Sequence, residues 1–270
     1  MTYIDNNGRI TNAEYIYYMK EYIAQNRERF FEELFSLLRI PSVSSQPDHK
    51  NDMQTCAERL VELILEAGAD SAAVYPTKGH PVVFGRKDVP GAEGTVLVYG
   101  HYDVQPPDPL GEWKTPPFEP TAKEDGRVYC RGAQDDKGQF FAFLCGVREL
   151  LGGATDKSLP VNLKIVLEGQ EESGSGTLFK LIQDRDFVKK IAADVLLVSD
   201  TSAASEMRPA IIAALRGVCH FTVKLTGANR DLHSGEYGGI APNAAQGMAS
   251  LMASLHNPDG SIAVSGFRDG

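Results

Sequence analysis

The sequence predicts an α/β fold with a mostly parallel mixed sheet flanked by helices, and two observations support this prediction. Short apolar runs alternate with longer segments whose apolar residues have helical spacing, a pattern typical of parallel strands joined through helices. A proline-rich segment at 105–120 cannot be an interior strand, because proline lacks the amide donor of a sheet ladder, so we expect a loop beside the sheet. The runs expected to form strands are 81–84, 95–100, 161–169 and 193–200.

Four segments have the pattern of helices. Thr11 and Glu14 fit a capping box, which predicts a helix that begins there and runs to about Leu38. A second helix is expected over 53–67, ending near Gly68. Its buried stripe is predicted to contain Leu60, Leu63, Ile64 and Leu65. The other two helices are expected at 138–151 and 176–191.

The chain changes in character after Pro209. The segment 211–227 is strand-like, 241–257 looks helical, and a second strand is expected before the end of the chain. One strand–loop–helix unit with a second strand is too little for an independently stable domain. We therefore expect one domain over residues 1–214 and the beginning of another over residues 215–270.

Composition and charge exclude several classes of protein. Acidic residues outnumber basic ones 36 to 27, and the net charge of −9 disfavours nucleic-acid binding, because phosphate contacts need a concentrated positive field. No apolar run approaches the roughly 18 to 20 residues of a membrane span, and the first residues lack the order of a signal peptide, so we expect a cytoplasmic protein. Four cysteines without CxxC spacing indicate neither a disulfide framework nor a structural zinc knuckle.

Side chains that can bind metal follow the expected strands. In open α/β sheets, ligands bind beyond the carboxyl ends of the strands, so these side chains are expected to converge. They are His101 and Asp103 after 95–100, Glu171 and Glu172 after 161–169, Asp200 at the end of 193–200, and Asp135 and Asp136 before the helix at 138–151. Clustered carboxylates repel one another and take up protons unless a cation neutralises them, so the cluster implies bound metal. An imidazole with several carboxylates suits a catalytic pair of Zn²⁺ ions, or Mn²⁺ or Co²⁺, better than a closed thiolate site.

His101 has a plain alternative as a core histidine bonded to a backbone carbonyl. The HxD spacing favours a metal ligand, because residues two apart in an extended chain face the same way and Asp103 can then accept a hydrogen bond from the second imidazole nitrogen. Glu171 and Glu172 could form a solvated loop edge or the acid and base of a glycosidase, but adjacent residues in an extended chain point apart. We expect one of these carboxylates to bind metal and the other to move a proton from a metal-bound water to the leaving nitrogen.

The remaining motifs are weaker on their own. Asp135 and Asp136 could equally be acids that the macrodipole favours at a helix N-terminus. The glycine-rich stretch 174–176 lacks the GKS/T ending of a phosphate loop and follows two carboxylates that would repel phosphate, so nucleotide binding is excluded. A nucleophilic serine is unsupported, because the sequence contains no GxSxG elbow.

Five ordered motifs together resemble one known family over nearly the whole chain. They are GHYDVQP (100–106), GAQDDKGQ (132–139), EGQEESGSG (168–176), VSD (198–200) and DLHSGEYGG (231–239). The family is the zinc metallopeptidase family of carnosinase and cytosolic nonspecific dipeptidase, carboxypeptidase G, aminoacylase and acetylornithine deacetylase. The loop around Trp113 and the DLHSG segment look most similar to its dipeptidase branch.

The resemblance implies a two-zinc hydrolase that cleaves dipeptides or small peptides through a metal-bridging hydroxide. The roles that it implies by position are Glu171 as the general base, Asp103 as the residue that orients His101, and His101, Asp135, Glu172 and Asp200 as metal ligands, with Asp135 bridging both ions. The sequence departs from the family at Gln134, where Thr or Ser is frequent, and at Thr201, where Asn is frequent.

The resemblance also implies that the segment after about Leu215 begins an inserted lid and dimerisation domain. There His233 would stabilise the oxyanion of the scissile amide, commonly in the site of the other subunit of a homodimer. The family's last metal-ligand histidine and its substrate-carboxylate arginine are expected beyond position 270. Two alternatives stay open: an N-acyl-amino-acid deacylase with the same centre, and a non-catalytic metal-binding or dimerising fragment, against which the spare base Glu171 counts.

Overall fold

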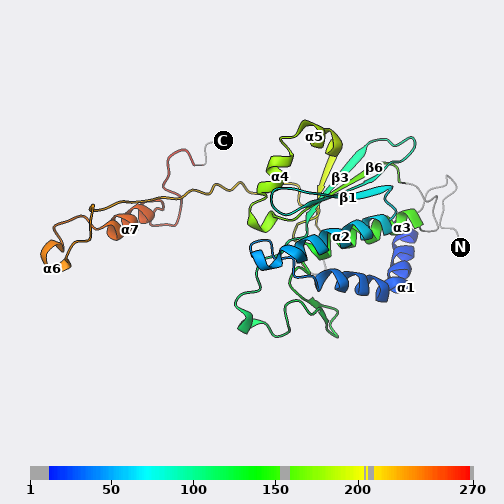
Figure 1. Ribbon diagram of the computed structural model, residues 1–270, viewed down its shortest axis with the longest axis horizontal. Coiled ribbons are helices and arrows are strands. Elements are labelled where there is room, and N and C mark those ends of the chain that lie inside the picture. The colour runs from blue at the N-terminus through cyan, green and yellow to red at the C-terminus, as the bar shows by residue number, and fades with distance from the viewer. Residues whose placement is uncertain (1–11, 153–158, 204, 206–209, 268–270) are drawn as a thin grey trace. The chain divides into compact units, whose positions relative to one another are not determined.

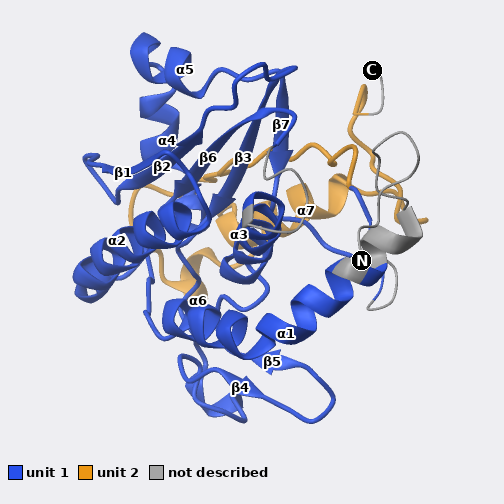
Figure 2. Cartoon of the chain, turned by 90° about the vertical axis from the view of Figure 1, so that its right-hand side faces the viewer, with its two compact units in different colours: residues 1–211 blue, residues 212–270 orange. Residues whose placement is uncertain are grey.

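The computed structural model describes residues 12–152, 159–203, 205 and 210–267, and the chain divides into two compact units. The first unit comprises residues 1–211 and the second residues 212–270 (Figure 2). The expected capping box falls on Thr11, which lies outside the described residues, and the first helix is described from Asn12.

A five-stranded mixed sheet forms the centre of the first unit (Figure 1). Its order is β1-β2-β6-β3-β7; β3 runs parallel to both β6 and β7, whereas β1 pairs with β2, and β2 with β6, in antiparallel register. The strands are β1 Ser71–Tyr75, β2 Val82–Lys87, β3 Thr95–His101, β6 Asn162–Glu168 and β7 Val195–Val198. The predicted α/β class is confirmed, and the expected loop at 105–120 contains no strand.

Helices cover both faces of this sheet (Figure 1). One face packs against α1, α2 and α3, and the other against α4 and α5. Their bounds are α1 Asn12–Leu38, α2 Lys50–Glu66, α3 Lys137–Gly152, α4 Gly176–Leu181 and α5 Arg185–Ile191. The 3-10 helices are η1 Pro47–His49, η2 Leu110–Glu112 and η3 Glu171–Ser173, and a separate hairpin joins β4 Thr121–Ala122 to β5 Val128–Tyr129. In the second unit, α6 spans Ser234–Tyr237 and α7 spans Ala244–Ser254.

Strand β6 contributes side chains to two hydrophobic cores, one on each face of the sheet. Leu163, Ile165 and Leu167 alternate along the strand, so they point to one face and join the larger core with α2 and α3. Val166 points to the other face and packs near Phe187 of α5. A strand covered on both faces carries apolar residues on both, which makes the apolar run at 161–169 easy to detect in the sequence although Asn162 and Lys164 interrupt it.

Two helix predictions need correction. The single helix expected over 176–191 is two helices, because the Asp184 side chain accepts the amide N–H groups of Asp186 and Phe187 and so caps the beginning of α5. Leu65, expected in the buried stripe of α2, has 44% of its surface exposed. It follows Ile64 by about 100° around the helix axis, which turns it away from the sheet.

The strands expected in the C-terminal part are not formed. The described segment 211–227 contains no strand, and the second expected strand is reduced to an isolated bridge between His256 and Ile262. The helix expected over 241–257 is present as α7. A strand needs a hydrogen-bonded neighbour as well as an apolar pattern, and 211–227 has none among the residues that the structure describes.

Candidate metal centre

The parallel strands of the sheet bring the candidate residues to one edge. His101 is the last residue of β3 and lies directly opposite Glu168, the last residue of β6. The turn η3 follows β6 and carries Glu171 and Glu172, and Asp200 follows the end of β7 by two residues. Because β3, β6 and β7 all run the same way, their carboxyl ends meet at this edge.

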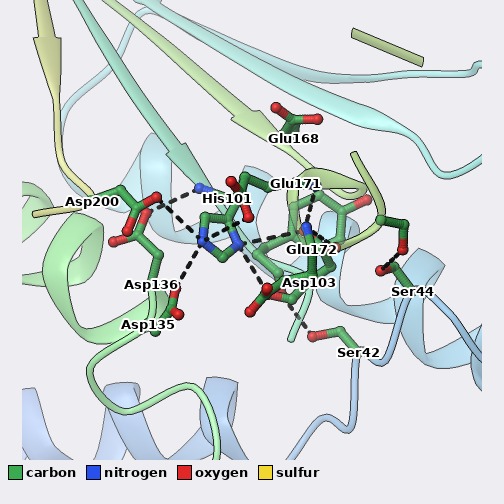
Figure 3. A network of polar contacts seen from close by, with 12 residues as sticks. Ser42, Ser44, His101, Asp103, Asp135, Asp136, Glu168, Glu171, Glu172 and Asp200 are labelled. Atoms are coloured by element: carbon green, nitrogen blue, oxygen red, sulfur yellow. Dashed lines mark hydrogen bonds and ion pairs between the residues drawn. The ribbon is translucent and has the colours of Figure 1, made fainter. Parts of the chain in front are cut away.

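His101 is the centre of the cluster and its side chain is fully buried. Its Nε2 atom lies 2.9 Å from Oδ1 of Asp135, 3.6 Å from Oδ2 of Asp200 and 3.9 Å from Oε2 of Glu171 (Figure 3). Its Nδ1 atom lies 3.0 Å from the carbonyl oxygen of Asp103 and 3.4 Å from that residue's carboxylate. A proton held at Nδ1 by these oxygens leaves the Nε2 lone pair free for a cation.

Two sets of side chains around His101 have the spacing of metal ligands. One set adds Asp135 and Asp200 to the imidazole, and the other adds Glu171 and Glu172; within each set, one ligand atom per residue lies within 4.8 Å of the others. The structure therefore brings together all of the residues proposed as ligands from the sequence. His101 is common to both sets, so the two sets adjoin.

The chemistry of this donor set fits a divalent cation. Burial raises the pKa of Glu171, Glu172 and Asp200, because a carboxylate is costly to ionise where water is scarce. Burial alone would lower the pKa of His101, but its hydrogen bond to Asp103 and the carboxylates around it raise the value to about 10. A cation would let the carboxylates ionise and would displace the imidazole proton, so hard oxygen ligands and one nitrogen suit it.

Asp103 has a second contact that the sequence did not predict. Its buried carboxylate accepts hydrogen bonds from the backbone N–H groups of Glu171 and Glu172, each at 3.1 Å. The same residue therefore contacts the imidazole of His101 and holds the turn that carries the two glutamates. Figure 3 shows Asp103 between them.

Asp135 reaches His101 through a tight turn before α3. A Cβ atom on Gly138 would lie 1.9 Å from the carbonyl oxygen of Ala133, so only glycine allows the chain to fold back this closely. The neighbouring Asp136 is buried, and its Oδ2 atom accepts the backbone N–H of His101 at 3.0 Å. Burial raises the pKa of Asp136 to about 8.

Sequence reasoning missed several residues that support the site. Buried Lys137 donates to the carbonyl oxygens of Leu37 and Ile40 and so caps the end of α1. Gln139 accepts the backbone N–H of Thr201, next to Asp200. Gln105 donates to Oε2 of Glu172 at 2.7 Å. Each of these three polar residues lies inside a motif that carried the family resemblance, so their position in those motifs was the only signal available.

His233 belongs to the second unit. There it precedes α6, and its Nδ1 atom accepts the backbone N–H of Gly235 at 3.0 Å. Its part in catalysis stays a prediction.

The fold and this centre define the class of protein, and a family model gives the same answer. The chain belongs to peptidase family M20/M25/M40, whose model matches residues 97–262. The family predicted from the five motifs is therefore confirmed. Membership of this metallopeptidase family implies divalent-metal binding.

The chain is similar over most of its length to named dipeptidases. Cys-Gly metallodipeptidase dug1 of Schizosaccharomyces pombe is 32% identical over 261 residues, covering 92% of this chain and 54% of that protein. Human Beta-Ala-His dipeptidase is 33% identical over 277 residues, covering 95% and 49%. A solved M20 family metallo-carboxypeptidase from Sulfolobus solfataricus matches with a TM-score of 0.71 and 31% identity, covering 89% of this chain and 52% of that chain. The chain spans about half the length of these relatives.

Proposed function

We propose that the intact protein is a metal-dependent dipeptidase that hydrolyses the amide bond of dipeptides or small peptides. The reaction would use two divalent ions, and zinc is the metal that we propose first. The observation that carries this proposal is the convergence of the carboxylates of Asp135, Glu171 and Asp200 on Nε2 of one buried imidazole, with Glu172 in the same group of possible ligands. The names of the relatives, Cys-Gly metallodipeptidase and Beta-Ala-His dipeptidase, support a dipeptide substrate.

Four residues would hold the ions: His101, Asp135, Glu172 and Asp200. Asp135 would be the carboxylate that both ions share, a role that the family resemblance implies, and its Oδ1 atom lies 2.9 Å from Nε2 of His101. When bound, divalent ions would polarise the scissile carbonyl and make water a stronger nucleophile. Asp103 keeps the His101 proton on Nδ1, which aims Nε2 at the ions.

Glu171 is proposed as the general base. Its carboxylate lies at the edge of the cluster, 3.9 Å from Nε2 of His101, and 39% of the side chain is exposed, so water and substrate can reach it. It would accept a proton from the attacking water and pass it to the nitrogen of the departing amine. Burial raises its pKa, which brings a carboxylate closer to the neutral range in which both transfers are easy.

The second unit is proposed to begin a lid and dimerisation domain, with the catalytic domain over 1–214. Apolar side chains of 211–227 face water: Leu215 is 81% exposed, Val218 79% and Phe221 74%. Large apolar surface of this kind mostly marks an interface, which supports a homodimer through this segment. His233 is proposed to stabilise the oxyanion of the tetrahedral intermediate. No helix in the described part of the chain is long and apolar enough to cross a membrane, and the cytoplasmic location stays a prediction.

The substitution Glu171→Gln tests the proposal. We expect hydrolysis of a panel of dipeptides, with Zn²⁺ or Mn²⁺ added, to fall by about 10² to 10⁴, because proton transfer is lost. Metal content by elemental analysis should stay unchanged. Glu93→Gln is the matched control, since Glu93 is an exposed glutamate that precedes β3.

Each other outcome would have a definite meaning. Full turnover by Glu171→Gln would refute its role as the base. Hydrolysis of N-acyl amino acids without hydrolysis of dipeptides would replace the dipeptidase by a deacylase. Metal binding by the wild-type chain without turnover on either substrate class would favour a non-catalytic module.

A further inference from the structure

A buried glutamate that no part of the proposed reaction uses lies next to the centre. Glu168 ends β6 and its side chain is fully buried. Its Oε1 atom accepts hydrogen bonds from the hydroxyl of Tyr99 at 2.7 Å and from the hydroxyl of Ser175 at 2.9 Å, and its Oε2 atom is buried with no hydrogen-bond partner among the described residues. Burying a carboxylate is costly, so a glutamate at this position calls for a specific reason.

Ser175 shows where this carboxylate acts. Its backbone is left-handed, with φ of 54°, and it is the one described residue other than glycine with positive φ. It also precedes the first residue of α4, where a serine hydroxyl usually caps the helix, yet it makes no such bond. The hydroxyl is instead committed to Glu168, and this bond holds a backbone conformation that costs about 1 kcal/mol or more in residues other than glycine.

The strained residue closes the turn that carries the two candidate glutamates. The backbone N–H of Ser175 donates to the carbonyl oxygen of Gln170 at 2.7 Å, so residues 170–175 form one closed loop. Asp103 binds the beginning of this loop by accepting the N–H groups of Glu171 and Glu172. Glu168 binds the end of the loop through the hydroxyl of Ser175.

Tyr99 extends the contact to the other ligand set. It lies on β3, its hydroxyl donates to Glu168, and its carbonyl oxygen accepts the N–H of Ser199, the neighbour of Asp200. A continuous chain of hydrogen bonds therefore joins the strand end that carries Asp200 to the turn that carries Glu171 and Glu172.

We propose that Glu168 is a positioning residue that, through Ser175 and Tyr99, sets the place of the Glu171–Glu172 turn relative to the Asp135–Asp200 side of the centre. It does not bind metal or substrate. The inference rests on the proposed metal centre, and adds to it a buried carboxylate that aligns one half with the other.

The test is a double-mutant cycle read by metal binding instead of turnover. Ser175→Gly removes the hydroxyl but fits the left-handed backbone without strain, so the chain should stay folded. Two Co²⁺ ions should bind in two steps, and we expect Ser175→Gly to weaken one of these steps about 10-fold or more, because supporting residues of this kind contribute roughly 10- to 100-fold to metal affinity. The visible absorption of bound Co²⁺ should change as well. Ser36→Ala is the control, since that hydroxyl bonds the carbonyl oxygen of Glu33 within α1.

The second arm substitutes Glu168→Ala alone and in the Ser175→Gly background. If Glu168 acts through Ser175, the double variant binds Co²⁺ no more weakly than the weaker single variant. The inference would be overturned if the losses of Co²⁺ affinity from the two substitutions added up. It would also be overturned if Ser175→Gly kept wild-type affinity and absorption; either result would leave the metal centre in place. A wild-type chain that binds no Co²⁺ would overturn the centre and the inference together. If Glu168→Ala does not fold, Tyr99→Phe takes its place in the cycle.

Discussion

Strand β6 and the segment 211–227 have similar apolar patterns but different structures. In β6, Leu163, Ile165 and Leu167 are buried, whereas in 211–227 Leu215 is 81% exposed. The difference lies in their neighbours: β6 pairs with β2 on one side and β3 on the other, and helices cover both faces. An apolar pattern thus becomes a strand only where another strand completes its hydrogen bonds and a further layer covers its side chains.

The same contrast explains where the candidate metal centre can exist. Three strand ends held in register keep His101, Glu171 and Asp200 within a few ångströms of each other. His233 lies in a unit whose described side chains are mostly exposed, and the hydrogen bond that its side chain accepts comes from Gly235, two residues along the chain.

The largest expected difference between the two regions is the loss of stability when a leucine side chain is truncated. Leu167→Ala should lower the free energy of unfolding by about 2 to 5 kcal/mol, because it removes buried methyl groups and leaves a cavity. Leu215→Ala should change it by less than about 0.5 kcal/mol, because that side chain already faces water. Urea unfolding followed by circular dichroism measures both, and a loss at Leu215 equal to that at Leu167 would mean that the segment is packed in solution.

A second prediction uses the buried ionisable groups of the first unit. In the metal-free chain, the pKa of His101 is raised from 6.5 to about 10, so its stabilising effect is complete below about 6.5 and is lost as pH rises through 10. Asp136 is an acid whose pKa is raised from 3.8 to about 8, so its burial destabilises the fold increasingly over that range. Both pKa shifts destabilise the fold as the pH rises. The urea concentration at the midpoint of unfolding should therefore decrease as the pH is raised from about 5.5 to about 8.5.

Two variants check the source of this slope. Asp136→Asn keeps an acceptor for the N–H of His101 but cannot ionise, so it should flatten the slope. Asp259→Asn in the second unit should leave it unchanged, because hydrogen bonds from Ser261 lower the pKa of Asp259 and it stays ionised throughout this range. Added Zn²⁺ should reverse the trend, since a cation favours the ionised carboxylates. Stability that rises with pH in the metal-free chain would contradict the assignment.

The smallest expected difference is between two helix caps. Asp184 and Asn243 both accept two backbone N–H groups, at the beginning of α5 and α7. Asp184→Ala should lower the free energy of unfolding by about 0.5 to 2 kcal/mol, because α5 packs on the sheet. Asn243→Ala should reduce the helix signal of α7 and leave the main unfolding transition in place. An equal shift of that transition by both variants would show that the units unfold together.

Much of the fold could be predicted from the sequence, because its strands are strongly patterned. The runs at 95–100 and 161–169 carry apolar residues on both faces of the sheet, so most of their residues are apolar. The break between α4 and α5 was missed because the residues on both sides continue the helical spacing, and only the Asp184 cap separates them. The prediction of a strand at 211–227 was wrong, because an apolar pattern cannot reveal whether a partner strand is present.

The candidate site, like the fold, could be predicted from the sequence only in part. His101, Asp135 and Asp200 stand where strands or helices begin and end, so position along the sequence was enough to propose them. Glu168 stands at such a position too, but nothing in the sequence indicated that its side chain turns away from the cluster toward Tyr99 and Ser175.

The sequence by itself determined the α/β class, the family and the set of candidate metal ligands, because these depend on residue types and their spacing. Only the tertiary structure decided which nitrogen of His101 faces the carboxylates, that Asp103 holds both His101 and the glutamate turn, and that Glu168 is buried behind them. The physical reason is that hydrogen bonds between residues distant in the chain depend on strand register and side-chain direction, which appear only when the sheet has formed.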